Sequence, residues 1–164
     1  MIETDREVTA EIIKRKVEKY NRHKSANNLG KMYEYLEILI KQGPRQWTEE
    51  DIEAVNDIIR SVIDEHLLEA ENKGDHTIFD SFCEFKFLSQ FLFISTNCNR
   101  QEVHLQLVKS FAMLIANLKE EVALYYFFSN NFLNNIISND NFKNYDDDFL
   151  SYYVNFLKSL SQKL

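Results

Sequence analysis

Apolar residues recur at intervals of three and four along most of this 164-residue chain, a spacing that predicts amphipathic α-helices. The strongest example lies near the C-terminal end, where large apolar residues fall on one helical face: Phe149, Tyr152, Tyr153, Phe156, Leu157 and Leu160. A helix with such a face is stable only when the face packs against neighbouring helices. We therefore expect a buried terminal helix, with Asp146 as its N-cap.

The rest of the chain shows the same periodicity, and we expect about seven or eight helices in all. The upstream helices are predicted over residues 5–23, 32–42, 48–73, 78–96, 103–118, 120–128 and 132–137. The helix over 78–96 is apolar on most of its circumference, which is typical of a helix covered on several sides. In the first helix only a thin stripe of Val8, Ile12 and Tyr20 is apolar, so this helix is expected to dock loosely.

Turn-forming residues are scarce, since the chain has only three glycines and one proline. A sheet protein of this size would need many more, so the scarcity favours long helices joined by short loops. This rhythm predicts an all-α fold, an armadillo- or HEAT-like stack of antiparallel helices, although the sequence contains no clear repeat. We expect a charged N-terminal helix over residues 1–26 and a helical domain over residues 27–164. Thr48 and Asp51 have the spacing of a capping box within that domain.

Composition and charge narrow the class of protein. Hydrophobic residues make up 45% of the chain and aromatic residues 13%, which excludes disorder over most of its length. A net charge of −7 with one small basic patch does not fit a nucleic-acid binder, whose positive surface is broad. Two cysteines, and four charged residues within the first seven positions in place of a signal peptide, predict a reducing, cytoplasmic environment.

Basic residues gather in the predicted first helix: Lys14, Arg15, Lys16, Lys19, Arg22 and Lys24. Such a cluster is most often a solvated helix face. The alternative is contact with an anionic membrane surface, where each nearby basic residue contributes roughly 1 kcal/mol. The thin apolar stripe would support only weak insertion. Peripheral membrane binding is therefore an alternative function for the chain.

The sequence contains no arrangement typical of catalysis or metal binding. The nearby residues of metal-ligating type, His76, Cys83, Cys98 and His104, lack the paired spacing of a zinc site. Cys83 lies among phenylalanines and is expected in the core, and His66 continues an apolar stripe and is expected to be half-buried with a hydrogen-bond partner. There is no Gly-rich phosphate loop and no nucleophile elbow. We expect no cofactor, no metal and no enzymatic activity.

Two motifs near the C-terminal end resemble a known family. Residues 124–131 read LYYFFSNN and residues 152–164 read YYVNFLKSLSQKL, with an acidic turn between them. Both are similar to the signature of the FPL domain, the N-terminal domain of a group of endosomal maturation proteins. Shorter likenesses precede them in matching order: Thr48-Glu49-Glu50, Ile59-Arg60-Ser61, Phe79-Asp80-x-Phe82 and Val103-x-Leu105-Gln106-Leu107. The resemblance covers about residues 29–164, and the last helix is its most specific part.

The resemblance implies an armadillo-like domain in proteins of endosomal, lysosomal and Golgi membrane trafficking that also act in autophagy and mitophagy. Family members act as scaffolds and are linked to HOPS-type tethering machinery and to ubiquitin ligases. They are much longer than this chain, and the charged first helix is not part of their pattern. The motifs single out these candidate partner-binding residues: Tyr125, Asn130, Asn131, Tyr152, Tyr153 and Lys158. We expect a cytoplasmic scaffold that associates peripherally with endosomal, lysosomal or Golgi membranes.

Alternatives stay open for the aromatic residues and for the chain as a whole. Each aromatic residue of the last helix can serve core packing alone. Part of that face can instead be exposed at the end of the stack, where a partner or further helices would cover it. The chain can also be a short, self-contained FPL protein that competes with longer members for their partners.

Overall fold

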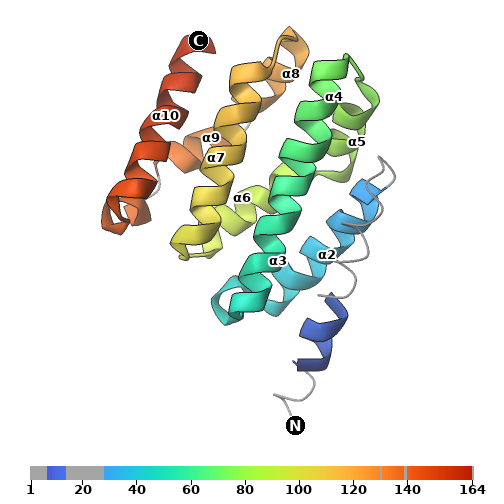
Figure 1. Ribbon diagram of the computed structural model, residues 1–164, viewed down its shortest axis with the longest axis vertical. Helices are drawn as coiled ribbons and strands as arrows, with labels where there is room; N and C mark the ends of the chain where they lie inside the picture. Colours follow the sequence, from blue (N-terminus) through green and yellow to red (C-terminus); the bar gives the residue numbers. More distant parts are fainter. Residues whose placement is uncertain (1–6, 14–27, 130, 139, 164) are drawn as a thin grey trace.

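The computed structural model describes residues 7–13, 28–129, 131–138 and 140–163, and it places them in helices and short turns with no strand (Figure 1). The α-helices that follow the segment over residues 7–13 are α2 (Leu29–Gln42), α3 (Glu49–Arg60), α4 (Leu68–Lys73), α5 (Thr77–Phe85), α6 (Phe87–Asn97), α7 (Gln101–Asn117), α8 (Glu121–Phe128), α9 (Asn131–Ile137) and α10 (Asp147–Lys163). A π-helix, Ser61–Leu67, joins α3 to α4 without a break, and short 3-10 helices cover Pro44–Gln46 and Asp140–Asn144. The all-α prediction is confirmed.

Two of the long helical segments, α3–α4 and α7, lie side by side and run in the same direction (Figure 1). Near their starts, the Arg100 guanidinium donates a hydrogen bond to the Glu49 carboxylate at 2.7 Å. Near their ends, the backbone N–H of Lys119 donates to the Glu71 carboxylate at 3.0 Å. Contacts at both ends show that the two segments are parallel over their whole length.

The helix α10 repeats this relation on the other side of α7. The backbone N–H of Asp146 donates to Gln101 Oε1 at 3.0 Å, and the Lys163 ammonium donates to the Leu118 carbonyl at 3.1 Å. Both bonds span 45 residues, so a residue of α7 lies level with the residue 45 positions later in α10. α10 is therefore the outermost of three parallel helical segments.

A second layer, which contains α2, α6 and α9, lies behind these three segments (Figure 1). The Gln90 side-chain amide of α6 donates to the Tyr33 carbonyl of α2 at 3.0 Å, and Ser95 at the end of α6 contacts Asn135 of α9. Phenylalanines fill the space between the layers, and these are fully buried: Phe82, Phe87, Phe91, Phe111, Phe127, Phe149 and Phe156. Burial of each such side chain contributes about 1.5–3 kcal/mol.

The predicted helix caps are confirmed. The Asp51 N–H donates to Thr48 Oγ1 at 3.2 Å and the Thr48 N–H donates to Asp51 Oδ2 at 2.9 Å, which completes a capping box at α3. The Phe149 N–H donates to Asp146 Oδ1 at 2.9 Å at the start of α10. Each bond satisfies an N–H group that the first turn of a helix leaves without a partner.

The single helix predicted over residues 78–96 is wrong, because the chain breaks at Lys86 into α5 and α6. Lys86 has φ 63°, a left-handed conformation that a helix interior does not contain. The break lets the rings of Phe82 and Phe87 stack with centroids 5.6 Å apart, and both are fully buried. Apolar periodicity did not indicate the break, since both halves are apolar and no Gly or Pro lies between them.

The stripe predicted for the first helix is also wrong where it can be checked. In the helical segment over residues 7–13, Val8 and Ile12 are exposed, whereas Ile13 is buried. The packed face is thus rotated by about 100°, one residue, from the expected one. Tyr20 and the rest of the predicted helix lie outside the described residues. The division at residue 26 stays a prediction.

Candidate functional site

The candidate residues of the family motifs lie on different helices. Tyr125 lies on α8, Asn131 begins α9, and Tyr152, Tyr153 and Lys158 lie on α10. Figure 1 shows α8 near the top of the molecule and α10 along one edge, so the motifs do not form one cluster. Some candidates lie outside the described residues, namely Asn130, Lys14, Arg15, Lys16, Lys19, Arg22 and Lys24.

Tyr153 has a packing role. Its hydroxyl donates a hydrogen bond to the Ile137 carbonyl at 3.0 Å, and burial raises its pKa. Its ring packs edge-on against Phe142 with centroids 5.1 Å apart and stacks on Phe149. The residue ties α10 to the end of α9, and its side chain is only partly exposed.

Tyr152 and Lys158 point away from the core. Tyr152 is 40% exposed, and the Lys109 ammonium of α7 lies 4.3 Å from its ring centroid. This cation–π contact holds the tyrosine across the gap between α7 and α10. Lys158 is exposed on α10. Of the two alternatives left open for the apolar stripe of α10, Tyr152 therefore follows the second, an exposed position on this face.

The most exposed large apolar side chains among the described residues are Val122 and Tyr125, at 73% and 75%. They lie three residues apart and share one face of α8, which we name the α8 surface. The residues beside and opposite this surface anchor the helix well. Phe127 is buried, and the Tyr126 ring packs edge-on against Phe79 with centroids 5.7 Å apart. The exposure of the α8 surface is therefore not the result of a loosely packed helix.

A second apolar region, which we name the α10 edge, lies on the side of α10 that faces away from α7. It contains Leu150 and Val154 of α10, which are 37% and 47% exposed. Leu157 on the same side is partly buried. Leu150 and Val154 do not belong to the apolar stripe that the sequence singles out in this helix, so this region is a different face from the one left open there.

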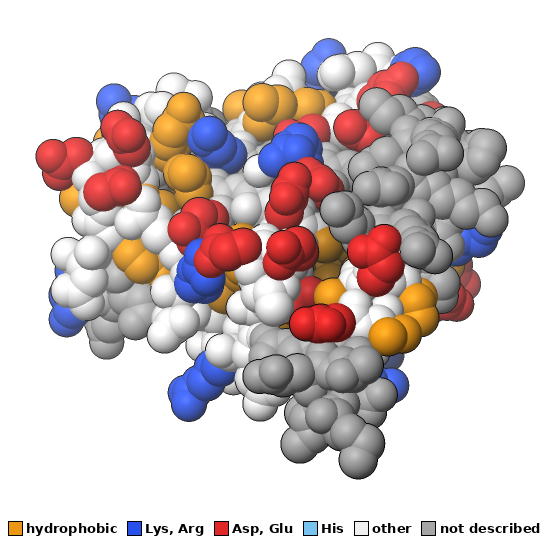
Figure 2. Space-filling model, turned by 60° about the horizontal axis from the view of Figure 1, so that its bottom comes forward, with side chains coloured by type: hydrophobic (Ala, Val, Ile, Leu, Met, Phe, Trp, Pro, Cys, Tyr) orange, Lys and Arg blue, Asp and Glu red, His pale blue; other side chains and the backbone are white. Residues whose placement is uncertain are grey.

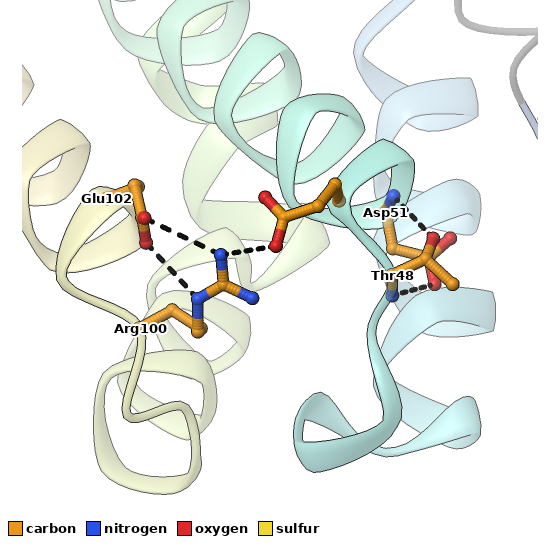
Figure 3. Close-up of polar contacts among 5 residues, drawn as sticks. Thr48, Asp51, Arg100 and Glu102 are labelled. Carbon is orange, nitrogen blue, oxygen red and sulfur yellow. Dashed lines mark hydrogen bonds and ion pairs between the residues drawn. The ribbon is translucent and has the colours of Figure 1, made fainter.

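Acidic side chains gather at the end of the molecule where the three parallel segments begin, the end that faces the viewer in Figure 2. Figure 3 shows Arg100 between Glu102 and the first turn of α3. Its guanidinium lies 2.7 Å from the Glu49 carboxylate and 3.3 Å from that of Glu102. A backbone hydrogen bond and Arg100 lower the pKa of Glu102. These carboxylates offset the positive ends of helix dipoles, so their placement has a structural explanation.

A buried polar network around His104 was missed by sequence reasoning. His104 is fully buried; its Nε2 lies 2.9 Å from the Ser95 carbonyl and its Nδ1 lies 2.6 Å from the Tyr145 hydroxyl. Since a carbonyl only accepts, Nε2 carries the proton and Nδ1 accepts from Tyr145. Burial lowers the pKa of His104 and raises the pKa of Tyr145 to about 12. The sequence does not indicate this network, because the partners Tyr145 and Ser95 lie 41 and 9 residues away from His104.

The described residues contain no group of three or more His, Cys, Asp or Glu side chains placed to hold a metal ion. Burial raises the pKa of the Cys83 and Cys98 thiols, so the reactive thiolate form is disfavoured. His66 is buried, and its Nδ1 lies 2.7 Å from the Ser61 carbonyl, which confirms the expected hydrogen-bond partner. Of the helices in the described part, none has the length and apolar character needed to cross a bilayer.

Known proteins with similar sequences identify the family. The FPL family model, described as an uncharacterised conserved protein, matches residues 59–164. Protein CLEC16A of Homo sapiens is 34% identical over 117 residues, which cover 71% of this chain and 11% of the relative. The CLEC16A homolog of Caenorhabditis elegans is 38% identical over 93 residues, 57% of this chain and 10% of the relative. Protein TRANSPARENT TESTA 9 of Arabidopsis thaliana is 33% identical over 110 residues, 67% of this chain and 13% of the relative.

The matched region is thus a small part of these relatives, between 10% and 13% of their length. No solved structure matches the chain. The α8 surface and the α10 edge both lie within the matched residues 59–164. The motif resemblance is confirmed, and the chain belongs to the FPL family.

Proposed function

We propose that this chain is a non-enzymatic, armadillo- or HEAT-like protein-interaction domain that acts as a scaffold in endosomal and lysosomal membrane trafficking and in autophagy, including mitophagy. Family membership supports the cellular setting. The parallel long segments with a second helical layer behind them support the type of stack. The expected partners are HOPS-type tethering machinery or a ubiquitin ligase, with the chain on the cytoplasmic side of endosomal, lysosomal or Golgi membranes.

The observation that carries an interaction role is the α8 surface. A valine and a tyrosine at 73% and 75% exposure on a well-anchored helix leave apolar area in water that a partner can bury. Tyrosine is also a residue type that contributes strongly at protein interfaces, because its ring is large and rigid. Tyr125 belongs to the family motif over residues 124–131, so we assign partner binding to it.

Affinity purification of the tagged chain from its own cell type, followed by quantitative mass spectrometry, tests this function. We expect tethering factors or a ubiquitin ligase in the wild-type sample and at least about a tenfold loss with the double variant Val122→Asp, Tyr125→Ala, since interface anchors contribute about 2 kcal/mol or more. Met113→Asp is the matched control, because Met113 is also an exposed apolar residue but lies on α7. Equal recovery of partners by all three proteins would exclude the α8 surface, and the absence of trafficking proteins would contradict the proposed setting.

Peripheral membrane binding is a second candidate, and one observation favours it. Val8 and Ile12 lie one helical turn apart and are both exposed, directly before the basic cluster that begins at Lys14. An apolar face beside basic residues is the pattern of a helix that lies on an anionic bilayer. Flotation with vesicles that contain about 30% phosphatidylserine tests it, since each basic residue contributes about 1 kcal/mol. Binding that the triple change of Lys14, Lys16 and Lys19 to Glu abolishes would support this function, and binding that survives would exclude it.

A further inference from the structure

The α10 edge corresponds in position to the face of α7 that packs against α10. The 45-residue offset places Leu105 and Ala112 of α7 level with Leu150 and Leu157 of α10. The two helices also have the same rotational setting, because level pairs of inward residues are buried in both. These pairs are His104 with Phe149, Phe111 with Phe156, and Ile115 with Leu160.

Lys109 shows which side of α7 faces α10, because its ammonium lies over the Tyr152 ring. The residue of α10 level with Lys109 is Val154. With the same rotation, Val154 faces away from α7, towards the position that a further neighbour of α10 would take. Val154 is 47% exposed there, with Leu150 beside it at 37%. The α10 edge is therefore the face for a next helix, and no helix in the described part of the chain covers it.

One acidic and one basic side chain lie on this face, and their positions distinguish a parallel from an antiparallel neighbouring helix. At 100° per residue, Asp147 and Lys158 lie within about 40° of Val154 around the helix, so both line the same strip. Asp147 is near the start of α10 and Lys158 is past its middle. Both are exposed, and neither has an ion-pair partner among the described residues.

We propose that the α10 edge binds the α10 edge of a second copy of this chain, with the two α10 helices antiparallel about a two-fold axis near Val154. In this arrangement Val154 packs on its symmetry mate, and Leu150 and Leu157 of each copy flank it. Asp147 of each copy comes level with Ser161 of the other, about 4.5 Å along the axis from Lys158, and the long Lys158 side chain spans this distance to form two identical ion pairs. The dimer does not involve the α8 surface, so it leaves that surface open for the partner proposed above.

The antiparallel choice follows from charge. A parallel neighbour with an acidic first turn would bring carboxylates next to Asp147, as α3 and α7 do at their starts. That contact is bridged by Arg100, which lies between Glu49 and Glu102. The residue of the α10 region level with Arg100 is Tyr145, which supplies no positive charge. A second copy in antiparallel orientation needs no such bridge and also sets the helix dipoles in opposite directions.

Sedimentation velocity of the full chain, from about 1 µM to about 1 mM, tests the dimer in the range expected for a small interface. The weight-average mass should rise from 19.5 kDa towards twice that value, and Val154→Asp should keep the chain monomeric. Asn155→Asp is the matched control, because it adds the same charge to an exposed position of α10 outside the strip. A wild-type monomer at every concentration, or equal effects of both substitutions, would overturn the proposal and point to a helix of another protein as the occupant.

Charge reversal tests the orientation. Asp147→Lys and Lys158→Glu should each weaken the dimer about tenfold, because each single change converts two attractive contacts into repulsive ones. The double variant, which exchanges the two charges, should return to within about threefold of the wild-type constant. In a parallel dimer each residue would face its own copy, so a single reversal would leave the constant unchanged, and that result would exclude the antiparallel arrangement. Circular dichroism melting of each variant confirms that the helices are retained.

Discussion

The side chain of His104 connects three parts of the molecule through its two ring nitrogens. It joins the end of α6, through the Ser95 carbonyl, to the segment before α10, through the Tyr145 hydroxyl. Both nitrogens have a partner only while the ring is neutral with the proton on Nε2. Burial lowers the pKa of His104 below its ordinary value of 6.5, so the folded state resists protonation.

We predict that the fold loses stability as the pH falls below about 6.5, because only the unfolded chain then binds a proton at His104. The contribution of the neutral imidazole is fully present above that pH. Between pH 7.5 and pH 5.5 the wild type should lose about 1 kcal/mol more unfolding free energy than His104→Gln, which has no titrating group there. Urea unfolding at the two pH values measures this. An equal loss in both proteins would contradict the role of His104.

The neighbouring tyrosines Tyr152 and Tyr153 are predicted to differ in their contribution to stability. Tyr153→Phe removes the hydroxyl that donates to the Ile137 carbonyl and should lower the free energy of unfolding by about 1 kcal/mol. Tyr152→Phe retains the ring under Lys109 and should change it by less than about 0.5 kcal/mol. Chemical denaturation of both variants checks the difference. Equal effects would mean that the hydrogen bond of Tyr153 does not stabilise the fold.

At the scale of elements, the break at Lys86 is the main departure from the periodic pattern. Lys86 takes φ 63°, which costs a non-glycine residue about 1–2 kcal/mol. We predict that Lys86→Gly raises the free energy of unfolding by up to about 1 kcal/mol and that Lys86→Val lowers it. Gly74, at φ 73° after α4, is the matched control, since Gly74→Ala should be destabilising. A stabilising Lys86→Val would contradict the left-handed conformation.

The capping box of α3 gives a second prediction at this scale. Thr48→Ala removes the acceptor for the Asp51 N–H and should lower the free energy of unfolding by about 1 kcal/mol. Thr48→Ser, which keeps the oxygen, is the control and should stay within about 0.5 kcal/mol of the wild type. Thermal and urea unfolding provide the comparison. If Thr48→Ala and Thr48→Ser have the same stability, the cap does not contribute to the fold.

Helix existence and caps were predictable because they depend on residues that are close in sequence. The stripes of α3, α7 and α10 and the caps at Thr48 and Asp146 all follow from local spacing. The split at Lys86 and the rotation of the segment over residues 7–13 were not predictable. Both depend on which neighbour an apolar face meets, and that neighbour comes from elsewhere in the chain.

At the scale of the whole molecule, the parallel arrangement of α3–α4, α7 and α10 determines which charged and apolar side chains are exposed. It places three acidic helix starts at one end, where Arg100 bridges two of them (Figures 2 and 3). Within the described residues, it also leaves α10 with a parallel neighbour on one side only, which is α7. Neither consequence can be derived from the sequence, because no internal repeat indicates which helices lie level with one another. The candidate site was therefore predicted only in part: Tyr125 is exposed as an interaction residue should be, whereas Tyr153 packs.

Hydrogen–deuterium exchange of the chain, free and within the complex isolated from cells, tests the central claim that this FPL domain binds its partner through the α8 surface. We predict slower exchange over residues 121–129 in the complex and unchanged exchange over α3, which lies in the lower part of the molecule in Figure 1, whereas α8 lies near its top. Protection confined to helices other than α8 would contradict the account.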